Sequence, residues 1–308
     1  MATETMRELA VRSADGAMIN ALTEENPILA TMIVDKANNG IQNVVKEMSE
    51  VTGAVLTDLD APLATVSAKG ELITTDVSVL AGKQEVGVDT AKLLGGPGKY
   101  FTEYMPVILE ETGNNVEKSF IYNTVKPFGK ENEKGINAGG TNDGNMYSMV
   151  CVRWQPMENT GLYSEELDGK GLNFDITPLY SGGIYENDAK IPSYGQMMKT
   201  NLGFQFVNPK YVSYIANIDL ADNAGEYTAL PTKRQIQDMI RGARATNGNS
   251  YIYCHPAVLD ALADEYMSEV LRVSVDDDKF KYTFVEWNGI KFVTSWNFLE
   301  TEATEVFA

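Results

Sequence analysis

The chain has 308 residues, 44% of them hydrophobic, so it can bury a sizeable core as one large domain or as two. Its formal net charge is -18 and no stripe of Lys or Arg is visible, which excludes proteins that hold nucleic acid through many phosphate contacts. The apolar runs are short and residues 1–10 lack the basic and then apolar order of a secretory signal, so we predict neither a membrane span nor a leader.

Residues 1–35 carry two short helical patterns, one ending near Leu22 and one in which Asn26 caps a helix that begins with Pro27. Neither helix is long enough to be stable alone. The apolar residues of this segment therefore need a partner surface, either in the same fold or on another chain. We predict an N-terminal arm.

A long projecting hairpin is predicted between Thr52 and Val88, where Thr, Val, Leu and Asp are frequent and no helical period is present. Ala68-Lys69-Gly70 interrupts two extended runs, Leu63 to Ser67 and Leu72 to Leu80, and is the predicted turn. A two-stranded hairpin is marginally stable in water, so one of this length is expected to lie on another surface.

The glycine-rich stretch Gly95 to Gly98 predicts a hinge, and the longest helix is predicted from Met105 to Tyr122 with Pro106 in its first turn. Gly113 inside this helix costs about 1 kcal/mol relative to Ala. The segment Lys126 to Asn145 is rich in Gly, Asn and Lys, and we predict a mobile loop there.

The segment Ile191 to Leu220 predicts two aromatic strands that alternate in side-chain direction and are broken at Pro209, which cannot donate to a strand ladder. Such a two-sided strand system must be covered on both faces, by its own domain or by neighbouring copies. We expect two helices, Lys233 to Ala245 after the cap Thr232 and Pro256 to Met267, to cover much of it.

Two further strand regions complete the pattern. Tyr147 to Trp154 predicts a buried strand, and Asn288-Gly289 predicts a hairpin turn between Tyr282–Trp287 and Ile290–Trp296. Cys151 and Cys254 lie far apart in strand-like surroundings, which is typical of a reducing compartment, and we predict two buried free thiols.

Chemistry-bearing motifs are nearly absent from the chain. The single histidine, His255, precedes a helix and is predicted to cap it; the alternative is a reactive Cys254 thiolate beside it at the helix N-terminus. The run Asp276 to Asp278 lacks the spacing of a calcium loop, so we predict a solvated turn. Glu165-Glu166 are sequence neighbours and do not form a glycosidase pair. We predict no catalytic, cofactor-binding or metal-binding residue.

Five stretches of the sequence, taken together and in order, nevertheless carry a resemblance to known proteins. They are LTEENPILATM (Leu22 to Met32), YFTEYMPVILEETGNNVEKSFIYN (Tyr100 to Asn123), SMVCVRW followed by GLY (Ser148 to Tyr163), GFQFVNPKYVSYIANID (Gly203 to Asp219) and NGIKFVTSWNFLETEA (Asn288 to Ala303). In this order they resemble the major capsid proteins of tailed phages with the Hong Kong 97 type fold, and within them the epsilon fifteen phage branch.

The resemblance implies an α+β fold divided into five parts along the chain. They are an N-terminal arm (1–50), an extended β-hairpin loop (51–90), a peripheral domain with a long spine helix (91–147), a mainly axial domain (148–270) and a closing hairpin that returns to the peripheral domain (271–308).

The resemblance also implies a non-catalytic function: self-assembly through pentamers and hexamers into an icosahedral shell that encloses phage double-stranded DNA. Implied partners are copies of the chain, a scaffolding protein, a portal and a decoration protein, with no membrane. The implied location is the virion capsid, after assembly in the cytoplasm of the bacterial host. The alternatives are an encapsulin-like nanocompartment shell and a soluble enzyme that uses Cys254 and His255.

Two details of assembly follow from the same resemblance. Some relatives join neighbouring subunits by a Lys to Asn isopeptide bond, and Lys69 lies at the predicted hairpin tip, but this branch is not generally cross-linked and we expect no such bond. Because Met1 lies close to the arm, we expect scaffolding to come from a separate protein.

Overall fold

The computed structural model describes residues 4–5, 26–58, 62, 64–167, 175–181, 183–223, 226–266, 271–277 and 280–307. The predicted helix that ends near Leu22 lies outside these residues. The helix predicted from Pro27 is present as α3 (Pro27–Thr31), and Met32 ends it with extended backbone.

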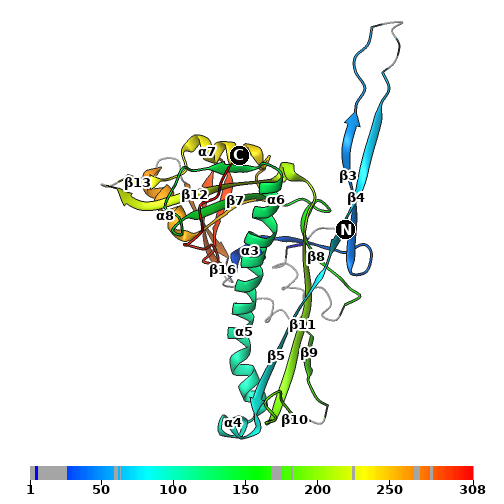
Figure 1. Cartoon of the computed structure of the whole chain (residues 1–308), viewed down its shortest axis with the longest axis vertical. Coiled ribbons are helices and arrows are strands. Elements are labelled where there is room, and N and C mark those ends of the chain that lie inside the picture. Colours follow the sequence, from blue (N-terminus) through cyan, green and yellow to red (C-terminus); the bar gives the residue numbers. More distant parts are fainter. Residues whose placement is uncertain are drawn as a thin grey trace.

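A long helical rod runs along the molecule (Figure 1). It consists of α5 (Pro97–Ser119), a π-helical turn η1 (Phe120–Val125) and α6 (Lys126–Glu131), and the short α4 (Val88–Leu93) lies at its lower end. The prediction of a long helix is confirmed, but it begins at Pro97, eight residues before Met105. Gly95 and Gly96 adopt positive φ of 91° and 112°, a turn that places Pro97 at the first helical position.

Two predictions around this rod are wrong in detail. Pro106 lies inside α5 at an exposed position instead of in its first turn, so the missing N–H leaves one helical carbonyl to solvent. The predicted mobile loop after Lys126 instead contains α6 and the strand β6 (Gly135–Asn137), which pairs in parallel with β12.

A seven-stranded sheet lies beside the rod and is organised by β11 (Pro192–Phe206). Along most of its length β11 pairs antiparallel with β5 (Ser78–Gly87), and Figure 1 shows this pair running parallel to α5. The remaining strands are β8 (Asn159–Tyr163), β9 (Asp175–Pro178), β10 (Tyr185–Glu186), β2 (Ile33–Lys36) and β1 (Glu4–Thr5).

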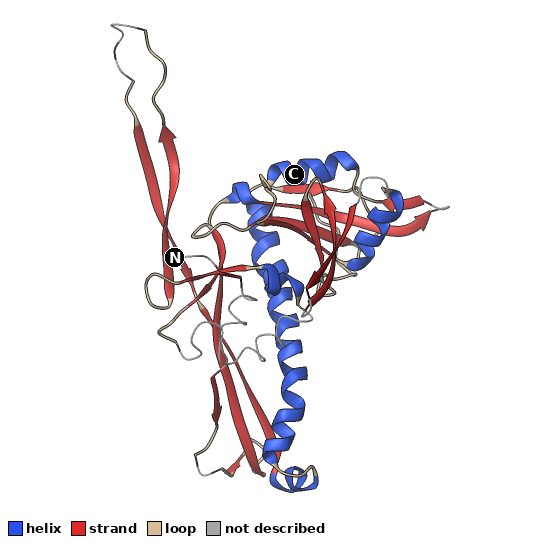
Figure 2. Ribbon diagram, turned by 180° about the vertical axis from the view of Figure 1, so that it is seen from behind, coloured by secondary structure: helices blue, strands red, loops and turns tan. Residues whose placement is uncertain are grey.

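The rod and the seven-stranded sheet form one body of the molecule. An eight-stranded sheet forms the second body, which we call the head (Figure 2). Its strand order is β13 (Glu226–Ala229), β12 (Val212–Asn223), β7 (Tyr147–Arg153), β14 (Ser250–Cys254), β17 (Ile290–Thr294), β16 (Phe280–Trp287) and β15 (Leu271–Asp277), with β6 also on β12. The helices α7 (Lys233–Gly242) and α8 (Pro256–Glu265) pack on one face, and η1 packs on the other.

The two strands predicted between Ile191 and Leu220 are present, broken by the 3-10 turn η3 (Pro209–Tyr211). They belong to different sheets, because β11 pairs with β5 while β12 pairs with β7. The predicted helical cover is therefore correct for β12, which α7 contacts, and wrong for β11, which is covered by the rod.

An aromatic cluster joins the two bodies. Phe120 of η1 lies 5.2 Å from Phe204, 5.9 Å from Phe206 and 5.7 Å from Trp154, measured between ring centroids. The Trp154 Nε1–H donates to the Tyr253 hydroxyl at 2.7 Å, so the polar atoms of both buried rings are paired. The core thus forms where the upper end of the rod meets both sheets.

The hairpin formed by β3 (Gln42–Thr52) and β4 (Ser67–Asp76) projects away from both bodies (Figure 1). A projecting hairpin is present, but its predicted strands and turn are wrong, because Leu72 of β4 lies opposite Lys46 of β3 and Leu80 pairs with Thr200 of β11. Lys69 lies within β4 and its Nζ pairs with Glu50 at 2.7 Å, while the Thr52 and Ser67 hydroxyls close the ladder at 2.8 Å. The connection is therefore residues 53–66 and not 68–70.

The closing hairpin agrees with its prediction, with Asn288 and Gly289 at positive φ of 50° and 77° between β16 and β17. Strand pairing does not follow the predicted domain limits, since β8 to β11 lie in the same sheet as β5, while β17 pairs with β14 in the head and β16 pairs with β17. The five-part division stays a prediction.

Candidate assembly surfaces

The hairpin presents apolar side chains that no other part of the described chain covers. Met48, Val51 and Leu72 are 53%, 67% and 72% exposed, and Val55, Leu56 and Val66 in the connection are exposed as well. A two-stranded ribbon in water gains little from burying these side chains on itself. The hairpin therefore has the composition of a surface that is buried by another molecule.

The base of the hairpin is fixed to the body by buried polar contacts. Asn43 Nδ2 donates to Gln205 Oε1 at 2.5 Å, and Gln205 Nε2 donates to the Met157 carbonyl at 2.5 Å. Val77 N–H also donates to the Ile41 carbonyl at 2.8 Å, where the chain leaves β4 for β5. The hairpin thus projects from a defined anchor and not from a free linker.

A second exposed apolar region lies at the lower end of the rod. Leu93 at the end of α4 is 88% exposed, and Tyr104 and Val107 of α5 are 45% and 63% exposed. Higher up, two neighbouring hollows of about 360 and 240 Å³ lie between α5 and β5, and both are lined by Leu80 and Asn115. These features leave one side of the rod available for contact.

The buried carboxylate of Glu117 ties the N-terminal segment to the rod. Its Oε1 accepts hydrogen bonds from the backbone N–H groups of Ile28 at 2.7 Å and Leu29 at 3.2 Å. Its Oε2 accepts from Ser295 Oγ at 2.5 Å and Asn297 Nδ2 at 2.9 Å. Burial raises the pKa of this carboxyl, while the four donors act against that shift.

A second buried carboxylate, Glu302, fixes the C-terminal segment to η1 and α6. It accepts from the Tyr122 hydroxyl at 2.6 Å, from Ser148 Oγ at 2.7 Å and from Lys126 Nζ at 2.6 Å. Burial raises the pKa of the Tyr122 hydroxyl, so it stays a donor at neutral pH. Buried carboxylates therefore hold both α3 and the C-terminal segment on the rod.

The sequence patterns did not identify either carboxylate. Glu117 had one detectable signal, since it lies next to Val116 and three residues before Phe120, on the apolar stripe of the predicted helix. An acidic residue on such a stripe indicates a buried polar contact. Glu302 lies in a segment without periodicity, and its partners are more than 150 residues away.

The cysteines and the histidine are arranged for structure. Cys151 and Cys254 are fully buried free thiols, as predicted; burial raises the pKa of Cys151 to about 12 and that of Cys254 further. His255 Nδ1 accepts from the Ala257 N–H at 3.2 Å, which confirms the predicted cap, and burial lowers its pKa. A neutral, enclosed thiol is a poor nucleophile.

We predict that neither thiol reacts with a maleimide at pH 8 while the chain is folded, and that both react in urea. Labelling of the folded chain is expected to be at least about a hundredfold slower, because reaction requires local opening of the sheet. Intact-mass spectrometry over time measures this. Rapid labelling of Cys254 in the folded chain would contradict the prediction and revive the enzyme alternative.

The remaining candidate motifs do not converge. Asp276 and Asp277 lie in β15, not in the predicted turn, and Asp278 is outside the described residues. Glu165 pairs with Lys36 at the surface. Within the described part of the chain, no group of three His, Cys, Asp or Glu residues is placed to hold a metal ion, and no helix is long and apolar enough to cross a membrane.

Comparison with known proteins gives one family match and several fold matches. A family model described as major capsid protein GP7 matches residues 122–306, more than half of the chain. The structure of bacteriophage Epsilon15 is similar with a TM-score of 0.61 and 15% identity, over 88% of this chain and 87% of that chain. The chain matches no curated protein sequence.

A second phage structure supports the same fold. The capsid of bacteriophage JBD30 is similar with a TM-score of 0.53 and 8% identity, over 90% of this chain and 92% of that chain. The SrpI encapsulin of Synechococcus elongatus reaches a TM-score of 0.45 and 10% identity over 64% of this chain and 89% of that chain, which is too low to carry an argument. The predicted α+β fold of the Hong Kong 97 type is confirmed.

Proposed function

The chain belongs to the major capsid protein GP7 family, and on this premise we propose that its copies assemble through pentamers and hexamers into an icosahedral shell around phage double-stranded DNA. Its role is structural and its place is the virion capsid. Assembly in the cytoplasm of the bacterial host is part of the proposal.

The observation that carries the proposal is the projecting hairpin with its uncovered apolar side chains. A single subunit leaves Val51 and Leu72 in water, whereas a lattice of copies can bury them against a neighbour. Each contact is modest, but closure of a shell couples many of them. One sequence can then form a durable container without any catalytic site.

We propose that the parts of the chain have separate tasks in this lattice. The N-terminal segment before β3 acts as an arm that reaches a neighbour, the hairpin of β3 and β4 lies over the adjacent capsomer, and the rod with the sheet of β11 supplies the peripheral domain. The sheet pairing supports a refined limit, in which the axial domain is the head and includes β16 and β17.

Other expectations remain parts of the proposal. We propose that a separate scaffolding protein and a portal take part in assembly, and that a decoration protein binds the outside. We propose that no residue of the chain is catalytic or binds a cofactor or a metal, and that the chain encloses DNA without reading its sequence. We propose no cross-link through Lys69, whose Nζ is paired with Glu50 within the hairpin.

Particles purified from infected cells test the proposal. Cryo-electron microscopy is expected to show closed icosahedral shells of this chain, and the particles are expected to contain double-stranded DNA protected from nuclease. A packed protein cargo in place of DNA would favour the nanocompartment. Sedimentation of all the protein as single 33.8 kDa chains would contradict shell assembly.

A further inference from the structure

The arginines of this acidic chain are concentrated on one edge of the head. All four arginines whose side chains the structure describes, Arg153, Arg234, Arg241 and Arg244, lie on or beside α7. Arg153 stacks over the Tyr211 ring at 4.7 Å and donates from Nη1 to the Arg244 carbonyl at 3.1 Å. We call Arg153, Arg241 and Arg244 the arginine edge.

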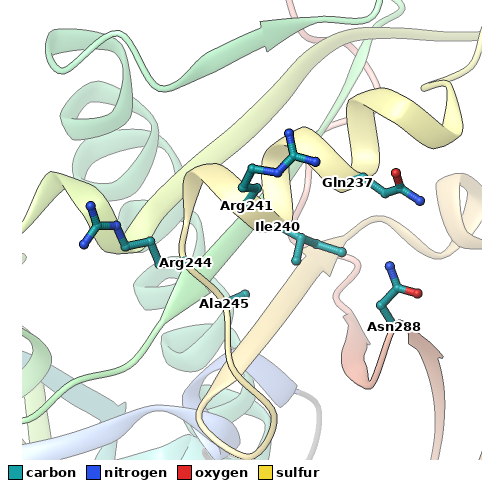
Figure 3. Close-up of a pocket in the computed structure, with 6 residues that line it drawn as sticks. All are labelled: Gln237, Ile240, Arg241, Arg244, Ala245 and Asn288. Carbon is teal, nitrogen blue, oxygen red and sulfur yellow. The ribbon is translucent and has the colours of Figure 1, made fainter.

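The arginine edge borders a shallow hollow of about 600 Å³ (Figure 3). Arg241 and Arg244 leave the end of α7 in different directions, Gln237 and Asn288 lie on the other side, and Ile240 lies between them. Guanidinium groups that diverge do not enclose a small ligand. They suit a protruding surface that carries several carboxylates.

Arg244 is the residue of this edge with the most unusual setting. Its backbone has a positive φ of 45° just beyond α7, a place that Gly or Asn usually takes. Within the described residues its guanidinium has no ion pair, whereas Arg241 is held by Asp238 at 3.0 Å. The Arg153 Nε atom is buried without a hydrogen-bond partner. The arginine edge therefore keeps N–H groups of Arg153 and Arg244 that can still donate hydrogen bonds.

An acidic edge lies on the other helix of the head. Asp260, Asp264 and Glu265 are exposed on α8, which contains no basic residue. Within the described part of the chain none of the three has an ion pair. Asp260 and Asp264 are four residues apart, so their like charges repel along the helix surface. We call these three residues the acidic edge.

The two edges lie on different sides of the same head. On the shared face of the sheet, α7 packs on β12 and α8 packs near β17, with β7 and β14 between those strands. The C-terminal end of α8 lies beside the start of α7, where Tyr266 donates to the Pro231 carbonyl and lies under Lys233. Arg241 and Arg244 lie at the far end of α7, about 15 Å away at 1.5 Å per residue.

The two helices that carry the edges lie at different levels of the head. Figures 1 and 2 look along the shortest axis, and in both views α7 follows the upper edge of the head while α8 lies below it. A cyclic ring is built from heterologous contacts, in which two different surfaces of one chain meet. Two edges of opposite charge attract each other where one copy follows the next in such a ring. Two copies of the same edge would repel each other, because their charges are alike.

We propose that the arginine edge of one copy docks on the acidic edge of the next copy around each pentamer and hexamer. This inference rests on the proposed assembly into rings and adds the partner surfaces. Packaged DNA is the less favoured occupant, because Asp238 lies among the arginines and pairs with both Arg234 and Arg241.

Charge reversal of each edge tests the contact in the full chain. Variant A carries Arg241→Glu and Arg244→Glu, and variant B carries Asp260→Lys and Asp264→Lys. Each alone is expected to lower the population of rings, at five and six times the 33.8 kDa chain mass, by more than about tenfold, because like charges then meet at every contact. Sedimentation velocity and native mass spectrometry measure the rings.

Rescue makes the test specific. A chain with all four substitutions has both charges inverted and is expected to form rings again. Mixing A with B is expected to restore hexamers but not pentamers, since A and B must alternate and only an even-membered ring closes without a mismatch. A chain with Lys130→Glu and Lys190→Glu, two exposed lysines outside both edges and outside the apolar region at the lower end of the rod, has the same change in net charge as A and is the matched control.

The outcomes separate this inference from the proposed function. If the wild type forms rings and A and B form them equally well, the inference is wrong while shell assembly stands. If A forms normal shells that retain less DNA, the arginine edge binds DNA and the inference is also wrong. The inference is also wrong if the chain with all four substitutions folds but stays monomeric. If that chain misfolds, the mixture of A and B decides, and the absence of hexamers from it would overturn the inference. A wild type that never forms rings refutes the proposed function itself.

Discussion

Truncation of the projecting hairpin is expected to leave a folded subunit that forms no closed shells. Replacing Lys46 to Leu72 by Asn-Gly joins Val45 to Ile73, which lie opposite each other in the ladder, through a two-residue turn. The buried contact between Asn43 and Gln205 remains. The free energy of unfolding is expected to change by less than about 1 kcal/mol, since the removed part makes no core.

The loss of shells follows from geometry. The removed segment carries Met48, Val51 and Leu72, the apolar side chains that the subunit itself leaves in water. Electron microscopy of particles and thermal unfolding of the soluble chain measure the two effects separately. As a control, a full-length hairpin with these three residues changed to Ser keeps the reach of the hairpin and removes only its apolar contact. Normal shells from the truncated chain would show that the hairpin is not an assembly element.

The features that were predicted correctly are those with local causes. The cap at His255, the turn at Asn288-Gly289 and the cap at Thr232 each depend on residues within three positions of one another. The predicted position of the hairpin turn was wrong because that prediction also used only local sequence. Residues 68–70 contain a glycine and attract a turn prediction, but the ladder is set by pairing between Glu50 and Lys69 across the connection.

The division of strands between sheets has no local cause. The segment from Pro192 to Asn223 looks like one strand system in sequence, yet β11 finds β5 more than 100 residues earlier and β12 finds β7. Only the break at Pro209 was visible. The arginine edge could not be predicted from local sequence either, because it brings together Arg153 and Arg244, which are 91 positions apart.

Removal of the Glu117 carboxylate is expected to destabilise the attachment of α3 and the C-terminal segment to the rod. Glu117→Ala removes the acceptor of three buried donors, from Ile28, Leu29 and Ser295, while the Asn297 amide keeps Asn26 and Asn114 as acceptors. We expect a loss of about 3 kcal/mol in the free energy of unfolding, measured by urea denaturation. Glu117→Gln is the matched control, since its carbonyl can still accept from α3 while its amide cannot accept from Asn297. It is expected to lose less.

The pH dependence of the free energy of unfolding, compared between the wild type and Glu117→Gln, shows how burial of Glu117 affects stability. Burial raises the pKa of the folded carboxyl above its usual 4.5, so the folded chain binds this proton more tightly than the unfolded chain does. The contribution of Glu117 to stability is therefore largest below pH 4.5 and decreases as the pH rises towards the raised value. We expect the unfolding free energy of the wild type, minus that of Glu117→Gln, to decrease from pH 4.5 towards neutrality. A difference that increases with pH would mean that the four donors outweigh burial and hold the pKa low.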